Sequence, residues 1–259
     1  MQLNNTPLYI GTSGYNHEDW KGNFAPREIT NYDMLTYYAE KGFNFLEIAF
    51  TFYRMPEPDK MAQIIARTGD KVKLSIRIPK GLSRDPHNVE EMEQFKKGIA
   101  PVAEAGMLAC LYADYHPSFS ASKKNQEQIL ALRESFPGTY FFAELANRTW
   151  YKGRIFDYFK ETDIGMTIID MPQGTGFAPY YPICTNNALY FKFYGKNPAW
   201  LTIGEKFLDD SYSNEALMKF KSDAINNTVM AKDSGMAFAS VANGQAPQGA
   251  LSMMALASK

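Results

Sequence analysis

The sequence is poor in the residues that build disulfide frameworks and zinc sites. Its 259 residues include three histidines and two cysteines, Cys110 and Cys184. Neither cysteine belongs to a CxxC pair. Disulfide scaffolds and cysteine-rich zinc sites need several closely spaced ligands, so this chain fits neither class.

Long apolar runs and an excess of charge are also missing. No stretch of about 18 apolar residues is present to span a bilayer, and the opening MQLNNTPLYI lacks the features of a signal peptide. The 27 basic and 28 acidic residues give a formal net charge of −1 without a basic stripe for nucleic acid. We therefore expect a cytoplasmic protein that binds a small-molecule ligand, with no nucleic-acid or membrane partner, and the oligomeric state stays open.

Familiar phosphate-binding and nucleophile motifs are missing too. The chain has no P-loop, no GxGxxG after its first β-rich run and no GxSxG. Gly11 and Gly14 do flank Ser13 behind an apolar run, but a proline-containing loop with Tyr15 and Trp20 follows instead of a helix that could bind a phosphate. We therefore expect this segment to be the end of the first barrel strand, with Ser13 facing the mouth of the barrel. No cofactor is expected.

The sequence does contain a regular alternation of strand and helix patterns. Strands that alternate with helices predict parallel pairing and right-handed crossovers, and eight units in a chain of this length predict a (β/α)8 TIM-type barrel. We expect one α/β domain over residues 1–259, with a long irregular loop at 171–187 between strands 6 and 7. The eight β-rich runs are 8–13, 44–50, 73–79, 108–114, 140–145, 165–170, 189–195 and 235–242.

Charged residues interrupt five of these apolar strands. Side chains alternate along a strand, which predicts that these five point into the barrel. They are Glu47, Arg77, Glu144, Asp170 and Lys192. Burying a charge costs several kcal/mol unless it is paired, so the set is either a structural ion-pair layer or an active site at the C-terminal mouth.

As an active site, the set suits acid–base chemistry. Glu47 and Glu144 could serve as general acid and base, with Asp170 beside them, while Lys192 and Arg77 hold an anionic group of the substrate. The three acids could also coordinate Mg²⁺ or Mn²⁺. No histidine lies on a predicted strand, however, so we expect no metal.

Aromatic residues gather at the predicted strand ends and in the loops that follow them. They would stack against a sugar ring or a base, or they would close the barrel as plugs. The members of this group are Tyr15, Trp20, Phe52, Tyr53, Trp150 and Tyr194.

Three segments resemble a known family. IGTSGYNHEDWKGNFAP, MLTYYAEKGFNFLEIAFTFYRMP and VKLSIRIPK are similar to the opening of domain of unknown function 72, the YecE-like proteins. AELANRTW, YFKFYGK and VANGQAPQGA resemble later motifs of that family. The resemblance implies a TIM-type barrel but no particular activity. It adds Arg54 and Asn243 to the expected substrate-binding residues.

The chain departs from the family pattern at several polar positions. Ala49, Ala146 and Tyr194 stand where the pattern has Asn, Arg and His, while Arg77 and Lys192 exchange one type of cation for the other. We expect an enzyme, either a hydrolase or an isomerase or lyase, acting on a small polar or phosphorylated, carbohydrate-like metabolite. The alternatives are a non-catalytic ligand-binding or regulatory barrel with a degenerate site and, by analogy of fold, a metal-dependent nucleic-acid-processing enzyme.

Overall fold

The computed structural model describes residues 1–198, 211–239 and 242–258. Its strands are β1 (Gln2–Leu3), β2 (Thr6–Ser13), β3 (Phe45–Ile48), β4 (Lys73–Arg77), β5 (Leu108–Tyr115), β6 (Phe141–Leu145), β7 (Gly165–Met166), β8 (Ile168–Asp170), β9 (Ala188–Phe193) and β10 (Asp233–Phe238). Its α-helices are α1 (Met34–Glu40), α2 (Pro58–Thr68), α3 (Lys80–Arg84), α4 (Val89–Glu104), α5 (Lys123–Glu134), α6 (Gly153–Glu161), α8 (Asn214–Asn227) and α9 (Gln245–Ala257). Short 3-10 helices are η1 (Glu18–Trp20), η2 (Phe50–Phe52), η3 (Gly69–Lys71), η4 (Arg148–Trp150) and η6 (Ala242–Gly244).

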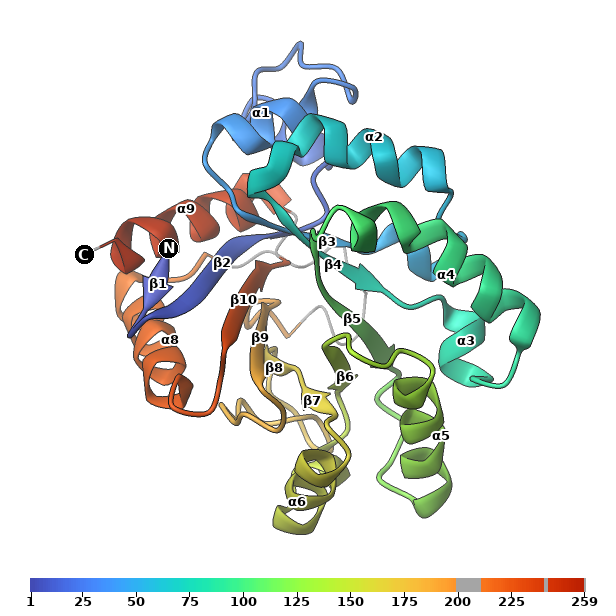
Figure 1. Ribbon diagram of the computed structural model, residues 1–259. Helices are drawn as coiled ribbons and strands as arrows, with labels where there is room; N and C mark the ends of the chain where they lie inside the picture. The colour runs from blue at the N-terminus through green and yellow to red at the C-terminus, as the bar shows by residue number, and fades with distance from the viewer. Residues whose placement is uncertain (199–210, 240–241, 259) are drawn as a thin grey trace.

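Nine parallel strands form a nearly closed barrel with the helices around it (Figure 1). The order is β7-β6-β5-β4-β3-β2-β10-β9-β8, and β1 pairs antiparallel with β2. Because β7 and β8 are separated only by Thr167, they occupy the place of one strand. The prediction of a TIM-type α/β barrel is therefore confirmed.

The observed strands are shorter at several ends than the sequence pattern suggested. The run at 44–50 stops as a strand at Ile48, and η2 begins at Phe50. The run at 165–170 is interrupted at Thr167. Between β8 and β9, residues 171–187 contain no helix or strand, and Ala178 donates a backbone hydrogen bond to the Ala146 carbonyl (2.8 Å). This loop thus packs against the segment that leaves β6.

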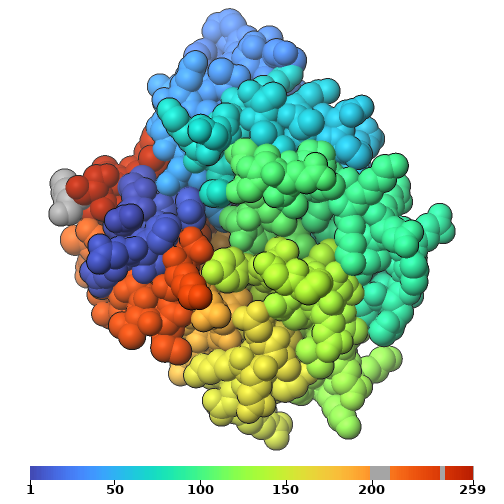
Figure 2. All heavy atoms as spheres, viewed as in Figure 1, coloured from blue at the N-terminus to red at the C-terminus, as the bar shows by residue number. Residues whose placement is uncertain are grey.

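Two apolar layers hold the barrel together. The larger lies between the strands and the surrounding helices, with outward residues such as Leu46, Ile76 and Phe191. The smaller lies inside the barrel and is rich in aromatic rings, including Phe45 and Phe142. Figure 2 shows that residues near the N-terminus lie against residues near position 230. At this contact the Thr6 hydroxyl donates a hydrogen bond to the Ala231 carbonyl (3.3 Å).

Gly11 is required where β2 meets β3. A Cβ atom built at this position would lie 1.7 Å from the Phe45 carbonyl oxygen and 2.5 Å from the Tyr38 hydroxyl. That hydroxyl donates to the same carbonyl (2.7 Å) and accepts the backbone N–H of Thr12 (2.9 Å). Gly11 therefore lets α1 and two strands share one buried hydroxyl.

We expect Gly11→Ala to destabilise the protein by about 3 kcal/mol or more, because backbone and a buried hydroxyl must move to admit the methyl group. Urea unfolding followed by circular dichroism measures the change. Gly153→Ala is the matched control, since nothing lies within 4 Å of a Cβ atom built there. An equal, small effect of both substitutions would contradict the expectation.

Candidate functional site

A pocket of about 640 Å³ opens at the C-terminal ends of the strands. This upper pocket is lined by residues from the ends of seven barrel strands or from the loops directly after them. Eight of the expected site residues line it: Ser13, Tyr15, Glu47, Tyr53, Arg77, Glu144, Lys192 and Tyr194. Four of the five charged residues that strand alternation predicts to point inward therefore lie together in this pocket: Glu47, Arg77, Glu144 and Lys192.

Lys192 forms the centre of the upper pocket. Its Nζ lies 3.1 Å from Glu47 Oε1 and 3.1 Å from Glu144 Oε2. Burial lowers the pKa of Lys192, but the two carboxylates raise it more strongly together, so the net pKa is above its usual value. The ammonium is therefore held charged between β3, β6 and β9.

Glu47 is fully buried, and both of its carboxylate oxygens have partners. The hydroxyls of Ser13 and Tyr190 both donate short hydrogen bonds to its carboxylate, in addition to the Lys192 ion pair. Glu47 therefore serves to position Lys192.

Glu144 differs from Glu47 because it reaches the pocket surface, with 8% of the residue exposed. The Tyr194 hydroxyl donates to its Oε1 (2.5 Å). Burial raises the pKa of Glu144, and the charges of Asp114 and Glu47 raise it further, whereas Lys192 and the Tyr194 hydrogen bond lower it. The net shift of the Glu144 pKa is upward, which suits a carboxyl group that takes part in proton transfer.

Arg77 is paired with a residue that the sequence analysis missed. Its Nε and Nη2 donate to the two carboxylate oxygens of Asp114, each at 2.5 Å. Its guanidinium also lies 3.7 Å from the centre of the Phe52 ring. Asp114 could have been found, because β5 alternates as the other strands do and pairs Asp114 beside Glu144.

Two tyrosines beneath the ion pairs were also missed. Tyr112 and Tyr190 lie on the same faces of β5 and β9 as Asp114 and Lys192, and Lys192 Nζ lies 4.6 Å from the centre of the Tyr112 ring. Both tyrosines are buried. Strand alternation would also have placed these two tyrosines inside the barrel, but the sequence analysis applied that rule to charged residues only.

The expectation that Asp170 points into the barrel is wrong. In the β8–β9 register Asp170 pairs with Phe193 and Ile169 pairs with Lys192, so Asp170 lies on the outer face. Its Oδ2 accepts a hydrogen bond from the Tyr212 hydroxyl (2.7 Å), before α8. The two consecutive isoleucines before it gave no alternation from which to choose the face.

Four expected substrate-binding residues do not line the upper pocket. Trp20 and Trp150 are fully buried, and the Trp150 indole donates to the Phe119 carbonyl (2.6 Å). They pack into the larger apolar layer between the strands and the helices. Arg54 and Asn243 are exposed outside the pocket.

Three of the departures from the family pattern lie at the upper pocket. Ala49, Ala146 and Tyr194 line it together. Two small apolar side chains therefore face the ligand space where larger polar groups would be expected. His17 and His116 also line it, although both follow strands in loops.

The described residues contain no group of three or more His, Cys, Asp and Glu side chains that could hold a metal ion. Asp170 cannot join Glu47 and Glu144 from the outer face. In the same part of the chain, no helix has the length and apolar character needed to cross a membrane.

We expect Lys192→Met to destabilise the protein by about 3–5 kcal/mol at pH 8, since two buried carboxylates lose their shared cation. Lys192 lowers the pKa of Glu144, so its removal raises that pKa further. A raised carboxyl pKa adds stability at low pH that is lost as pH rises through the folded-state value. The difference from the parent protein should therefore shrink as pH falls from 8 to 5.

Urea unfolding at several pH values tests this expectation. Lys123→Met is the control, because Lys123 pairs with Glu127 on the surface (3.8 Å, side chains 92% and 63% exposed). If Lys192→Met lowered the free energy of unfolding by the same amount at every pH, poor packing of the methionine would explain the loss, which would contradict the expectation.

Comparison with known proteins places the chain among barrels of the same architecture. A DUF72 family protein of Thermotoga maritima is 30% identical, with a TM-score of 0.89 over 98% of this chain and 100% of that one. A DUF72 family protein of Enterococcus faecalis is 20% identical, with a TM-score of 0.84 over 98% of each chain. D-allulose 3-epimerase from Methylomonas sp. shares the fold at 13% identity, with a TM-score of 0.57 over 98% of each chain.

No curated protein was found to match the sequence. The model of the family described as protein of unknown function DUF72 matches residues 9–259. That match spans nearly the whole chain and includes every residue of the upper pocket. The chain therefore belongs to the DUF72 family.

Proposed function

We propose that the upper pocket catalyses proton transfer at a carbon beside the carbonyl group of a small, neutral, polyhydroxylated substrate. The observation that carries this proposal is Glu144, a carboxyl group at the pocket surface whose pKa is raised by burial. A base with a pKa raised toward the working pH transfers protons efficiently in both directions.

Lys192 has the complementary role. Removal of a proton beside a carbonyl group leaves negative charge on the carbonyl oxygen. A preorganised ammonium in a water-poor site stabilises such charge more strongly than water does. Because Glu47 is fully occupied by Ser13, Tyr190 and Lys192, it acts as a positioning residue that keeps this ammonium in place.

The charge balance of the upper pocket favours a neutral substrate over a phosphorylated one. Among its described lining residues, three carboxylates (Glu47, Asp114, Glu144) and two cations (Arg77, Lys192) sum to −1, with the histidines neutral. The Nε and Nη2 groups of Arg77 already pair with both oxygens of Asp114, so much of its positive charge is balanced before a substrate binds. Tyr15 and Tyr53 offer aromatic faces to a sugar ring.

The likeness to a sugar epimerase is a likeness of fold alone. It nevertheless supports a choice of substrates to try, because epimerisation beside a carbonyl group requires the proton transfer proposed above. Ketohexoses and aldohexoses are therefore the first panel.

A non-catalytic binding barrel is the second candidate. It is favoured by Ala49 and Ala146, which present methyl groups where the family pattern has polar side chains. Such a barrel would bind the same class of ligand through Lys192, Glu144 and the tyrosines without exchanging its protons.

Incubating the protein with each sugar in D2O tests for catalysis, because reversible deprotonation replaces a carbon-bound hydrogen by deuterium, which NMR detects. We expect exchange with at least one sugar, and a loss of about 100-fold or more in Glu144→Gln. Glu104→Gln, an exposed change at the end of α4, is the control.

The two candidates give different results in this experiment. Saturable sugar binding by calorimetry without any deuterium incorporation would favour the binding barrel. Exchange that survives in Glu144→Gln would remove Glu144 from its proposed role.

We further expect Tyr194→Phe to move the acid limb of the pH–rate profile to higher pH. In the parent protein the Tyr194 hydrogen bond lowers the pKa of Glu144, so removal of the hydroxyl raises that pKa. A base must be ionised to act, and a higher pKa delays ionisation as pH increases. Deuterium exchange measured between pH 5 and 9 checks this, with Tyr37→Phe on α1 as control; an unmoved limb would contradict it.

A further inference from the structure

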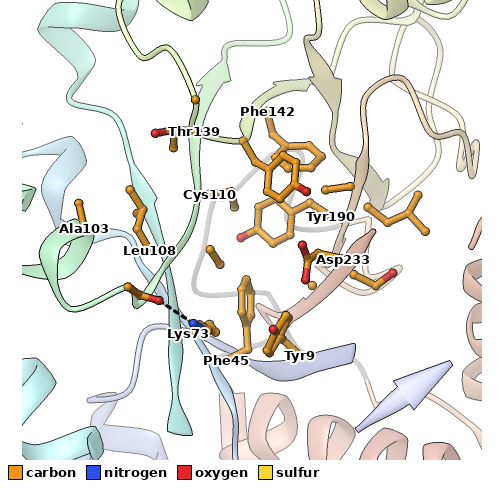
Figure 3. A pocket seen from close by; sticks show the side chains of 18 residues that line it. Tyr9, Phe45, Lys73, Ala103, Leu108, Cys110, Thr139, Phe142, Tyr190 and Asp233 are labelled. Atoms are coloured by element: carbon orange, nitrogen blue, oxygen red, sulfur yellow. Dashed lines mark hydrogen bonds between the residues drawn. The ribbon is translucent and has the colours of Figure 1, made fainter. Parts of the chain in front are cut away.

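A second pocket, the lower pocket, lies at the opposite, N-terminal end of the barrel strands. Its volume is about 340 Å³, within the range of small-molecule sites. Figure 3 shows the rings of Tyr9, Phe45, Phe142 and Tyr190 around it, with the Asp233 carboxyl group on one side. The function proposed above uses none of this space.

The lower pocket exists because small residues occupy inward positions that larger side chains usually fill. The interior of a TIM-type barrel is ordinarily packed by layers of bulky residues. Here Cys110, Ala188 and Gly235 line the pocket from β5, β9 and β10. A Cβ atom at Gly235 would lie 3.1 Å from the Phe45 ring, so even a methyl group would crowd this wall.

A β-bulge shapes one edge of the lower pocket. The β4–β5 register pairs Leu74 with Leu108 and then Ser75 with Cys110, which leaves Ala109 as the extra residue. Bulges re-aim side chains and are frequent beside binding sites. Ala109 lines the pocket at this point.

An aromatic layer separates the two pockets. Tyr190 makes edge contacts with Phe45, Phe142 and Tyr112, with ring centres 5.7, 5.5 and 5.7 Å apart. All four rings are buried. The lower pocket is therefore a separate cavity and not the base of the upper one.

Asp233 is the polar group that gives the lower pocket its chemistry. It is partly buried at the start of β10, and burial raises its pKa, while Tyr140 and Lys73 lower it. The Lys73 ammonium donates a hydrogen bond to the Gly106 carbonyl (2.6 Å, dashed in Figure 3). A carboxylate beside aromatic faces is the combination that binds a cation attached to an apolar ring.

We propose that the lower pocket binds a small aromatic amine. The ring lies among Tyr9, Phe45 and Phe142, and the ammonium pairs with Asp233. This proposal does not rest on the proposed catalysis at the other end of the barrel.

Phenethylamine is the probe, titrated into protein with ¹³C-labelled alanine methyl groups. We expect saturable shifts of the Ala109 and Ala188 methyl signals with a Kd of about 1 mM, typical of a fragment of this size. Ala49 and Ala146, which line the upper pocket, should shift less. The proposal would be overturned if the methyl signals of Ala49 and Ala146 shifted more than those of Ala109 and Ala188, or if no methyl signal showed saturation.

Charge and space are tested separately. Asp233→Asn should weaken binding about tenfold, as should replacing the probe by 2-phenylethanol, which lacks the cation. Ala188→Leu should abolish binding by filling the cavity, while Asp157→Asn, an exposed change on α6, should leave it unchanged. Equal binding of both probes, or undiminished binding by Asp233→Asn, would refute the role of the carboxylate.

Discussion

The ammonium of Lys192 makes it feasible for two carboxylates to be buried in one barrel. Glu47 and Glu144 come from β3 and β6, which are separated by β4 and β5 in the sheet, and Lys192 reaches both from β9. Each buried charge would cost several kcal/mol alone. The shared ion pair therefore connects three strands across the barrel interior with the chemistry of the upper pocket, because the ammonium that pairs with both carboxylates also lowers the pKa of Glu144.

Much of this arrangement follows from simple alternation along strands. Glu47, Glu144 and Lys192 were predicted to face inward because their sequence neighbours are apolar and must meet the helices. The rule worked where one polar residue interrupts an alternating strand. It failed at Asp170, because Ile168 and Ile169 are apolar on both sides and the outer face there holds a polar partner, Tyr212.

Loop residues were harder to predict for a different reason. Trp20 and Trp150 follow strand ends, as site residues often do, but the loops that carry them turn back into the core. Such a path depends on contacts distant in sequence, such as the Trp150 hydrogen bond to Phe119. Asp114 was within reach of the alternation rule, whereas its two-point pairing with Arg77 depends on the register between β4 and β5, which sequence periodicity does not specify.

Tyr190 belongs to both halves of the barrel interior. Its ring lines the lower pocket, while its hydroxyl donates to Glu47 beneath the upper one. Evolution therefore cannot alter the two ends of the barrel independently at this position. A substitution that enlarges one cavity removes a donor from the other, so change at residue 190 must be accompanied by compensating change across the aromatic layer.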